Sequence, residues 1–215
     1  MNPEKLIPAS IVEGLFVRAL GTRLTPTAHA RLRQAGLDLD QKLERTYPLE
    51  KWKDFLRIAA DHVYAGLPLE AAYYAMGERF MEASAETLTG RALLSVMKLA
   101  GPMRTLGRAG RTFLANNTFS DVTLTEKSPT SAELRVNDVL ADMPTFAAGV
   151  LSRSLELVGA HNVVAVPEAF DGTACTFHVR WSEEPVSYVS DALITEAALE
   201  EATADAAAAE SREQA

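Results

Sequence analysis

The chain has little of what cross-linked or metal-bound folds require: one cysteine and four histidines in 215 residues. A single cysteine excludes an internal disulfide and any multi-cysteine zinc site. No two histidines stand at His-x-x-x-His spacing, so we expect no metal site. No run of about 18 apolar residues occurs, which excludes a membrane-spanning helix. The first residues lack the apolar core of a secretory signal, and we expect a cytoplasmic protein.

Recognisable catalytic and nucleotide-binding motifs are also absent. The sequence has no Gly-x-Ser-x-Gly nucleophile motif, no phosphate-binding Gly-x-x-x-x-Gly-Lys and no dinucleotide fingerprint after a strand. Glu13, Asp61 and Glu78 are carboxylates beside apolar helix faces, but no spacing pairs any of them with a second catalytic group. We therefore expect a non-enzymatic protein with no cofactor.

The net charge of -8 is unevenly distributed along the chain. Residues 1–182 carry 20 Lys plus Arg and 20 Asp plus Glu, whereas residues 183–215 carry one Arg and nine acidic residues. A neutral body has no general electrostatic attraction to nucleic acid or to anionic lipid. The composition predicts one domain, residues 1–182, followed by an acidic Ala- and Glu-rich tail, residues 183–215. The tail is expected to stay solvated, or to dock on a partner as a helix through Val189, Leu193, Ile194 and Leu199.

Apolar spacing predicts that the first half of the chain is helical. Residues 11–20 form a short apolar run that fits either a strand or a buried helix. Thr25 and Pro26 are typical of a helix start, and Gly36 is typical of its end. Further helices are expected between Pro48 and Gly66 and over residues 69–84, 89–99 and 103–114. Because the run at 89–99 is apolar on most sides, we expect that helix to be central.

Strand patterns dominate the second half. Residues 119–124 and 132–136 alternate on either side of turn residues and predict a hairpin. A helix is expected over residues 144–159, and a second hairpin from strands at 163–169 and 174–181. Four strands separated by one helix predict an α+β fold, in which an N-terminal helical bundle packs on one face of a four-stranded antiparallel sheet.

Two groups of side chains are candidates for a binding site. The first could line an apolar ligand pocket, although ordinary core packing is the favoured interpretation: Trp52, Phe55, Tyr73, Phe80 and Met97. The second group is Arg104, Arg108 and Arg111, which share one helix face. These arginines could bind a phosphate or an acidic partner, or they could form an ordinary solvated face.

His62 and Cys175 are two further candidates. His62 lies beside an apolar helix face and could be an axial haem ligand, but a histidine bonded to a backbone carbonyl is the favoured interpretation. Cys175 falls on the apolar face of its strand, whereas His178 falls on the opposite face. Cys175 is therefore expected to be a small buried hydrophobic residue rather than a nucleophile.

Four segments resemble a family of paralogous proteins that is abundant in myxobacteria. This family is described only as a domain of unknown function. The four segments are Glu13–Leu20, Tyr47–Trp52, Gly101–Arg104 and Asn116-Asn117. The resemblance covers about residues 11–182 and implies no activity.

The last third of the chain is similar to the ending of a superfamily with haem–nitric-oxide-binding domains, 4-vinyl-reductase-type domains and TRAPP vesicle-tethering subunits. The similar segments are Phe146–Leu151, Leu155–Gly159, Val163–Val166 and Gly172–Phe177. The resemblance implies a TRAPP-like fold that holds a haem, a fatty chain or another small apolar molecule between helices and sheet. The Tyr-x-Ser-x-Arg motif that clamps haem propionates is missing, and Cys175 is not where TRAPP subunits are acylated, so neither haem nor acylation is expected.

These observations together favour a non-enzymatic ligand-binding or regulatory domain with a small apolar ligand between helices and sheet. The alternative is a protein-interaction module that forms a homodimer through a sheet edge and docks its acidic tail on a protein partner.

Overall fold

The computed structural model describes residues 5–112, 122–137, 143–172 and 174–184. The chain divides into a compact unit, Met1–Glu183, and a second unit, Glu184–Ala215. The predicted tail, with its four docking residues, lies outside the described residues except for Glu183 and Glu184, and so does Asn116-Asn117.

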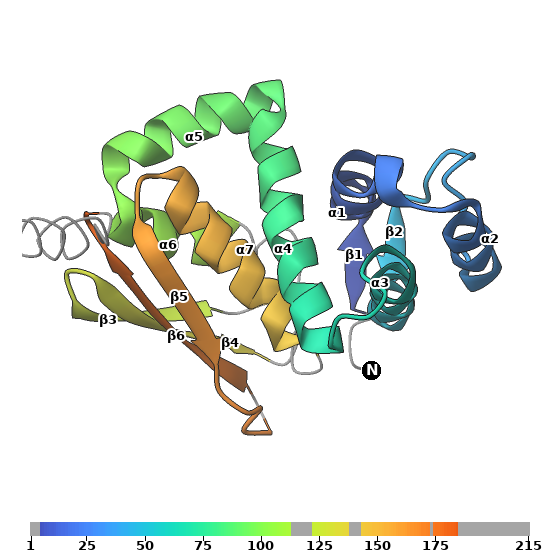
Figure 1. The fold of residues 1–215 in the computed structure, drawn as a ribbon. Coiled ribbons are helices and arrows are strands. Elements are labelled where there is room, and N and C mark those ends of the chain that lie inside the picture. The colour runs from blue at the N-terminus through green and yellow to red at the C-terminus, as the bar shows by residue number, and fades with distance from the viewer. Residues whose placement is uncertain (1–4, 113–121, 138–142, 173, 185–215) are drawn as a thin grey trace, which may run out of the picture. The chain divides into compact units, whose positions relative to one another are not determined.

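A four-stranded antiparallel sheet forms the second half of the compact unit (Figure 1). Its strands run in the order β3-β4-β6-β5: β3 (Val122–Ser128), β4 (Ser131–Asn137), β6 (Ala174–Ser182) and β5 (His161–Pro167). Each predicted hairpin forms, and the two hairpins join because β4 pairs with β6. The predicted α+β fold class and the four-stranded antiparallel sheet are confirmed.

Helices α6 (Pro102–Thr112) and α7 (Pro144–Leu157) pack on one face of this sheet. The alternation along β6 selects that face, because Cys175 and Phe177 are buried while His178 is exposed. Leu106 of α6 and Leu155 of α7 are fully buried against these strand residues. The predicted burial of Cys175 is confirmed, and desolvation raises the pKa of its thiol, as expected for an inert core cysteine.

The first half of the compact unit is helical apart from one small sheet, β1 (Leu6–Pro8) paired with β2 (Thr46–Pro48). Its helical segments are α1 (Ala9–Val12), the π-helix η1 (Glu13–Ala19), the 3-10 turn η2 (Gly21–Arg23), α2 (Pro26–Ala35), α3 (Leu49–Val63), α4 (Leu69–Glu86) and α5 (Leu88–Ala100). The ambiguous apolar run at residues 11–20 is therefore helical rather than extended.

The bounds of α2 follow from local chemistry, as the sequence predicts. The Thr25 hydroxyl accepts a hydrogen bond of 3.1 Å from the Ala28 N–H, which satisfies one of the free donors of the first turn. Pro26 follows at the first helical position, and Gly36 ends the helix in the left-handed region at φ 103°.

Aromatic side chains dominate a second apolar cluster, formed around α3 and α4. Trp52 meets Phe16 and Phe146 edge to face, with ring centroids 5.8 Å and 6.1 Å apart. Phe146 belongs to α7, so α7 contributes to this cluster as well as to the cluster on the sheet. Each cluster holds one of the two tryptophans, Trp52 and Trp181.

Two glycines allow α4 and α7 to pack backbone against backbone. A Cβ added to Gly77 of α4 would lie 2.1 Å from the Phe146 carbonyl oxygen. A Cβ added to Gly149 of α7 would lie 2.0 Å from the Tyr74 carbonyl oxygen. Because neither position has room for a side chain, this contact depends on glycine at both.

Helix α5 differs from the sequence expectation. None of its residues is buried, and its contacts are chiefly with α4 and α6, the helices that precede and follow it. In Figure 1 it extends from the end of α4 to the start of α6. The prediction that this helix is central is wrong, because α6 and α7 already cover the sheet and leave no inner position for an apolar helix. No helix among the described residues is long and apolar enough to span a bilayer.

Candidate functional site

The five residues predicted to line an apolar pocket do not stay together. Trp52, Phe55, Tyr73 and Phe80 are buried in the aromatic cluster, where they pack as core side chains. Met97 is half-buried on α5 and lies outside that cluster.

The predicted anion-binding arginines lie on α6. Arg104 and Arg108 are exposed, while Leu106 between them is buried against the sheet. Arg111 belongs to the same helix, but its side chain is outside the described part of the chain.

The histidines are spread over four elements. His62 is half-buried near the end of α3. His178 lies on the outer face of the sheet, where its Nε2 is 2.7 Å from the Glu168 carboxylate. Within the residues that the structure describes, no three histidine, cysteine, aspartate or glutamate side chains gather as metal ligands.

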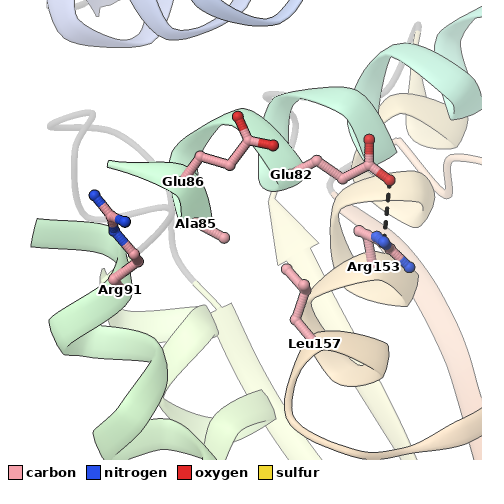
Figure 2. A pocket seen from close by; sticks show the side chains of 6 residues that line it. All are labelled: Glu82, Ala85, Glu86, Arg91, Arg153 and Leu157. Carbon is pink, nitrogen blue, oxygen red and sulfur yellow. Dashed lines mark ion pairs between the residues drawn. The ribbon is translucent and has the colours of Figure 1, made fainter. Parts of the chain in front are cut away.

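A pocket of about 460 Å³ lies between α4, α5 and α7, away from the predicted residues (Figure 2). We call it the α5 pocket. Glu82, Ala85 and Glu86 come from α4, Arg91 from α5, and Arg153 and Leu157 from α7. Its walls therefore offer carboxylate acceptors, guanidinium donors and a small apolar surface.

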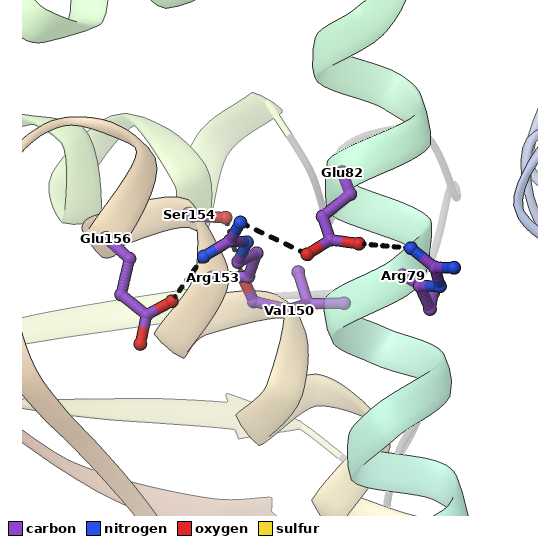
Figure 3. Close-up of polar contacts among 6 residues, drawn as sticks. All are labelled: Arg79, Glu82, Val150, Arg153, Ser154 and Glu156. Atoms are coloured by element: carbon purple, nitrogen blue, oxygen red, sulfur yellow. Dashed lines mark hydrogen bonds and ion pairs between the residues drawn. The ribbon is translucent and has the colours of Figure 1, made fainter.

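Two of the lining residues, Glu82 and Arg153, belong to an ion-pair network that spans α4 and α7 (Figure 3). Arg153 lies 3.1 Å from one carboxylate oxygen of Glu82 and 2.8 Å from Glu156. The other oxygen of Glu82 accepts a hydrogen bond of 2.9 Å from Arg79. Glu82 is thus held between two guanidinium groups, one from each helix.

Arg153 is incompletely satisfied by this network. Its two terminal nitrogens contact Glu82 and Glu156, but its Nε is buried and has no hydrogen-bond partner among the described residues. A buried N–H without an acceptor is unfavourable by about 1–3 kcal/mol. Arg153 therefore lines the pocket with its terminal nitrogens paired to carboxylates, while its Nε is buried beneath the surface.

Glu78 adds a third carboxylate to the same region. Burial raises the pKa of Glu78, and the charges of Glu156 and Glu82 raise it further, while Arg153 lowers it. One turn before Glu78 on α4, Tyr74 is also half-buried, and burial raises the pKa of its phenol. The helix pair thus carries a half-buried titratable group beside the pocket.

Sequence reasoning missed the α5 pocket, although part of its signal was visible. Glu82 stands three residues after Arg79, and Glu156 three residues after Arg153, which is the spacing of paired charges on a helix. That spacing does not show that the two pairs face each other. The facing arrangement requires the crossing of Gly77 and Gly149.

Solved structures with a similar fold include H-NOX proteins. The Fe(II) unliganded A71G mutant from K. algicida is 16% identical, with a TM-score of 0.62 over 83% of this chain and 98% of that chain. An H-NOX protein from S. oneidensis in the Fe(II)NO state is 10% identical, with a TM-score of 0.63 over 82% of this chain and 99% of the other. An oxygen-binding H-NOX domain related to soluble guanylate cyclases, solved as its oxygen complex, is also 10% identical, with a TM-score of 0.62 over 82% and 95%.

At these identities the similarity shows the fold alone. Among curated protein sequences, none matches this chain. A family model described as "Protein of unknown function (DUF2378)" matches residues 5–182. Because that match spans nearly the whole compact unit, the chain belongs to the DUF2378 family and has a fold similar to that of H-NOX domains.

Proposed function

We propose that this protein is a non-enzymatic, sensor-type domain that binds a small molecule in the α5 pocket. The pocket itself, a hollow that is open to solvent, is the observation that carries the proposal, since its volume of about 460 Å³ falls within the usual range for small-molecule sites. The H-NOX fold supports it by analogy, because similar structures have been solved as an oxygen complex and in an Fe(II)NO state.

The lining residues indicate the chemistry of the ligand. Ala85 and Leu157 offer apolar contact, while Arg91 and Arg153 offer N–H donors. The carboxylates of Glu82 and Glu86 accept hydrogen bonds and so favour donor groups on the ligand. The ligand we propose is therefore a small organic molecule with several polar groups, in place of the purely apolar molecule expected from the sequence.

Haem is the group that the resemblance implies, and the described residues do not fit it. Haem iron takes an axial His, Cys, Met or Tyr ligand, and none of these residue types lines the α5 pocket. His62, the candidate axial ligand, is not among the lining residues, and the aromatic side chains pack as core. The proposed ligand is therefore not haem.

The non-enzymatic character rests on the composition of the pocket. A hydrolase or transferase site needs a nucleophile beside a base, or a base within reach of the substrate proton. The lining residues contain no Ser, Thr, Cys, Lys, His or Tyr, and the Glu82 carboxylate, which could otherwise act as a base, is already paired with Arg79 and Arg153. Their carboxylates and guanidinium groups suit recognition of polar groups.

Native mass spectrometry of the full chain, purified from the cells that make it, tests the proposal. We expect a mass above that of the bare polypeptide, with the excess released as a small molecule on acid denaturation. Leu157→Trp and Ala85→Phe, which fill the α5 pocket from two helices, should each remove the excess mass.

Leu67→Trp is the matched control, because Leu67 is 52% exposed in the connection between α3 and α4. This variant should retain the ligand. Circular dichroism must show native helix content in each variant before its mass is interpreted. A bare polypeptide mass for the wild-type chain would overturn the proposal, and so would an excess mass that survives in both folded pocket variants.

A further inference from the structure

Helix α5 presents large apolar side chains to solvent on the compact unit. Leu88 and Leu99 are 82% and 90% exposed, and Leu93 and Val96 are about half exposed. At roughly 100° per residue, Leu88, Val96 and Leu99 fall within about a quarter of the helix circumference, with Leu93 beside them. We call these four residues the α5 face. Large apolar side chains exposed together on one side of a helix often mark an interaction site.

Positive charge accompanies the α5 face. Residues 88–112 contain five basic residues and no acidic residue: Arg91, Lys98, Arg104, Arg108 and Arg111. The side chains of Arg91 and Lys98 are exposed on α5 itself, and those of Arg104 and Arg108 are exposed on α6. The body as a whole is neutral, so this helix pair is a local basic region within it.

We propose that the α5 face docks an acidic amphipathic helix of a partner protein. Leucine-type side chains of such a helix would cover Leu88, Val96 and Leu99, and its carboxylates would meet Arg91 and Lys98. The complementary charge explains why the apolar face is accompanied by basic residues without any acidic residue.

Two other occupants fit the same face less well. A second copy placed symmetrically would bring the same cations against each other, and like charges at an interface are unfavourable. A helix that lies on a membrane usually carries aromatic residues among its apolar ones, and α5 has none.

Fluorescence anisotropy with a synthetic helix measures the proposed contact. The probe is a labelled 16-residue peptide with Leu at every third or fourth position and Glu on both flanks of the Leu stripe. We expect the full chain to bind it at least tenfold more tightly than a peptide with Lys in place of each Glu. The triple variant Leu88→Ser, Val96→Ser, Leu99→Ser should weaken binding at least tenfold, and Arg91→Gln with Lys98→Gln should reduce its salt dependence.

Matched variants separate this contact from a general effect on the fold. Since no residue of α5 is buried, the triple variant should keep the wild-type circular dichroism spectrum. Leu67→Ser removes an exposed leucine elsewhere on the surface and should bind the peptide like the wild type.

Four results with the full chain would overturn the proposal. Equal binding of the Glu and Lys peptides would show that charge does not contribute to the contact. Unchanged binding by the triple variant would show that the α5 face is not the binding site. Self-association of the wild type that the triple variant loses would assign the face to a second copy. Sedimentation of the wild type, but not the triple variant, with vesicles of three parts phosphatidylcholine to one part phosphatidylglycerol would assign it to a membrane.

A shortened chain that ends at Glu183 tests whether the acidic segment 184–215 of the same chain binds the α5 face. If it binds the Glu peptide tenfold more tightly than the full chain, the peptide competes with the acidic segment 184–215, and the proposal of a separate partner fails. Equal affinity of the two chains supports the proposal.

Discussion

Arg153 holds together three carboxylates that would otherwise repel one another. It pairs with Glu82 across the helix contact and with Glu156 one turn along α7, and it lowers the pKa of Glu78. Its side chain is 33% exposed, so solvent screens part of this attraction. The remaining attraction favours the same packing of α7 on α4 that the contact at Gly77 and Gly149 allows.

Glu78 makes the stability of the protein depend on pH. Because the pKa of Glu78 is raised by burial, the folded state binds more protons than the unfolded state just above the ordinary pKa of 4.5. The free energy of unfolding therefore falls as the pH rises through this window. Glu78→Gln should remove that decrease and make the protein more stable than the wild type at pH 7. Urea unfolding between pH 4 and pH 7 measures the difference.

Glu126→Gln is the control for this prediction, since Glu126 is exposed on β3. Its difference from the wild type should stay constant over the same pH range. If Glu78→Gln also shows a constant difference, or becomes less stable than the wild type toward pH 7, the assignment of a destabilising buried charge to Glu78 is wrong.

At the scale of elements, the contact of α4 with α7 positions the α5 pocket. Gly149→Ala would place a Cβ 2.0 Å from the Tyr74 carbonyl oxygen, and this clash can be relieved only if the helices separate. We expect a loss of about 3 kcal/mol in the free energy of unfolding, measured by urea titration.

Gly107→Ala on α6 is the matched substitution. Its new methyl group would meet a Leu124 methyl at 3.3 Å, and alanine favours a helix over glycine by up to about 1 kcal/mol. Gly107→Ala should therefore leave stability unchanged or raise it. Similar losses for the two alanine variants would contradict the backbone contact inferred for α4 and α7.

The elements that the sequence predicts correctly carry their own signals. Thr25, Pro26 and Gly36 mark the ends of α2 by side-chain and backbone chemistry within a few residues. Alternation from Cys175 to Trp181 identifies the buried face of β6 without reference to any other strand. The position of α5 has no such signal, because burial depends on which elements lie nearby and not on the hydropathy of the helix.

The α5 pocket could not be predicted for a related reason. Glu82 and Arg153 are separated by 70 residues and come together only through the crossing of α4 with α7. The aromatic residues were wrongly predicted to line a pocket because large apolar side chains have the same spacing on a core helix and on a pocket helix. Residue type and spacing identify helix faces, but they do not show which faces leave a space between them.

For the whole compact unit, α7 connects two apolar clusters, so we expect them to unfold together. Trp52 reports on the aromatic cluster and Trp181 on the cluster against the sheet. The variants Trp181→Phe and Trp52→Phe each leave one fluorescent probe. Within each variant, the urea midpoint from tryptophan fluorescence should coincide with the midpoint from far-ultraviolet circular dichroism.

Separate midpoints would show that the clusters behave as independent folding units, contrary to this expectation. The comparison is made within each variant, because either substitution changes overall stability. Agreement in both variants would show that the buried residues of α7, among them Phe146 and Leu155, couple the two halves.

The attachment of α5 at its two ends determines how it can move. The Thr87 hydroxyl caps its first turn, and Gly101 follows its last turn at φ 81°, a backbone geometry that favours glycine. The neighbouring helices α4 and α7 pack backbone against backbone at Gly77 and Gly149, so we expect this pair to be more rigid than α5. If the α5 pocket binds a ligand, we therefore expect α5 to tilt about its two ends while the contact of α4 with α7 stays unchanged. Ligand binding would then change the orientation of the exposed leucines of α5.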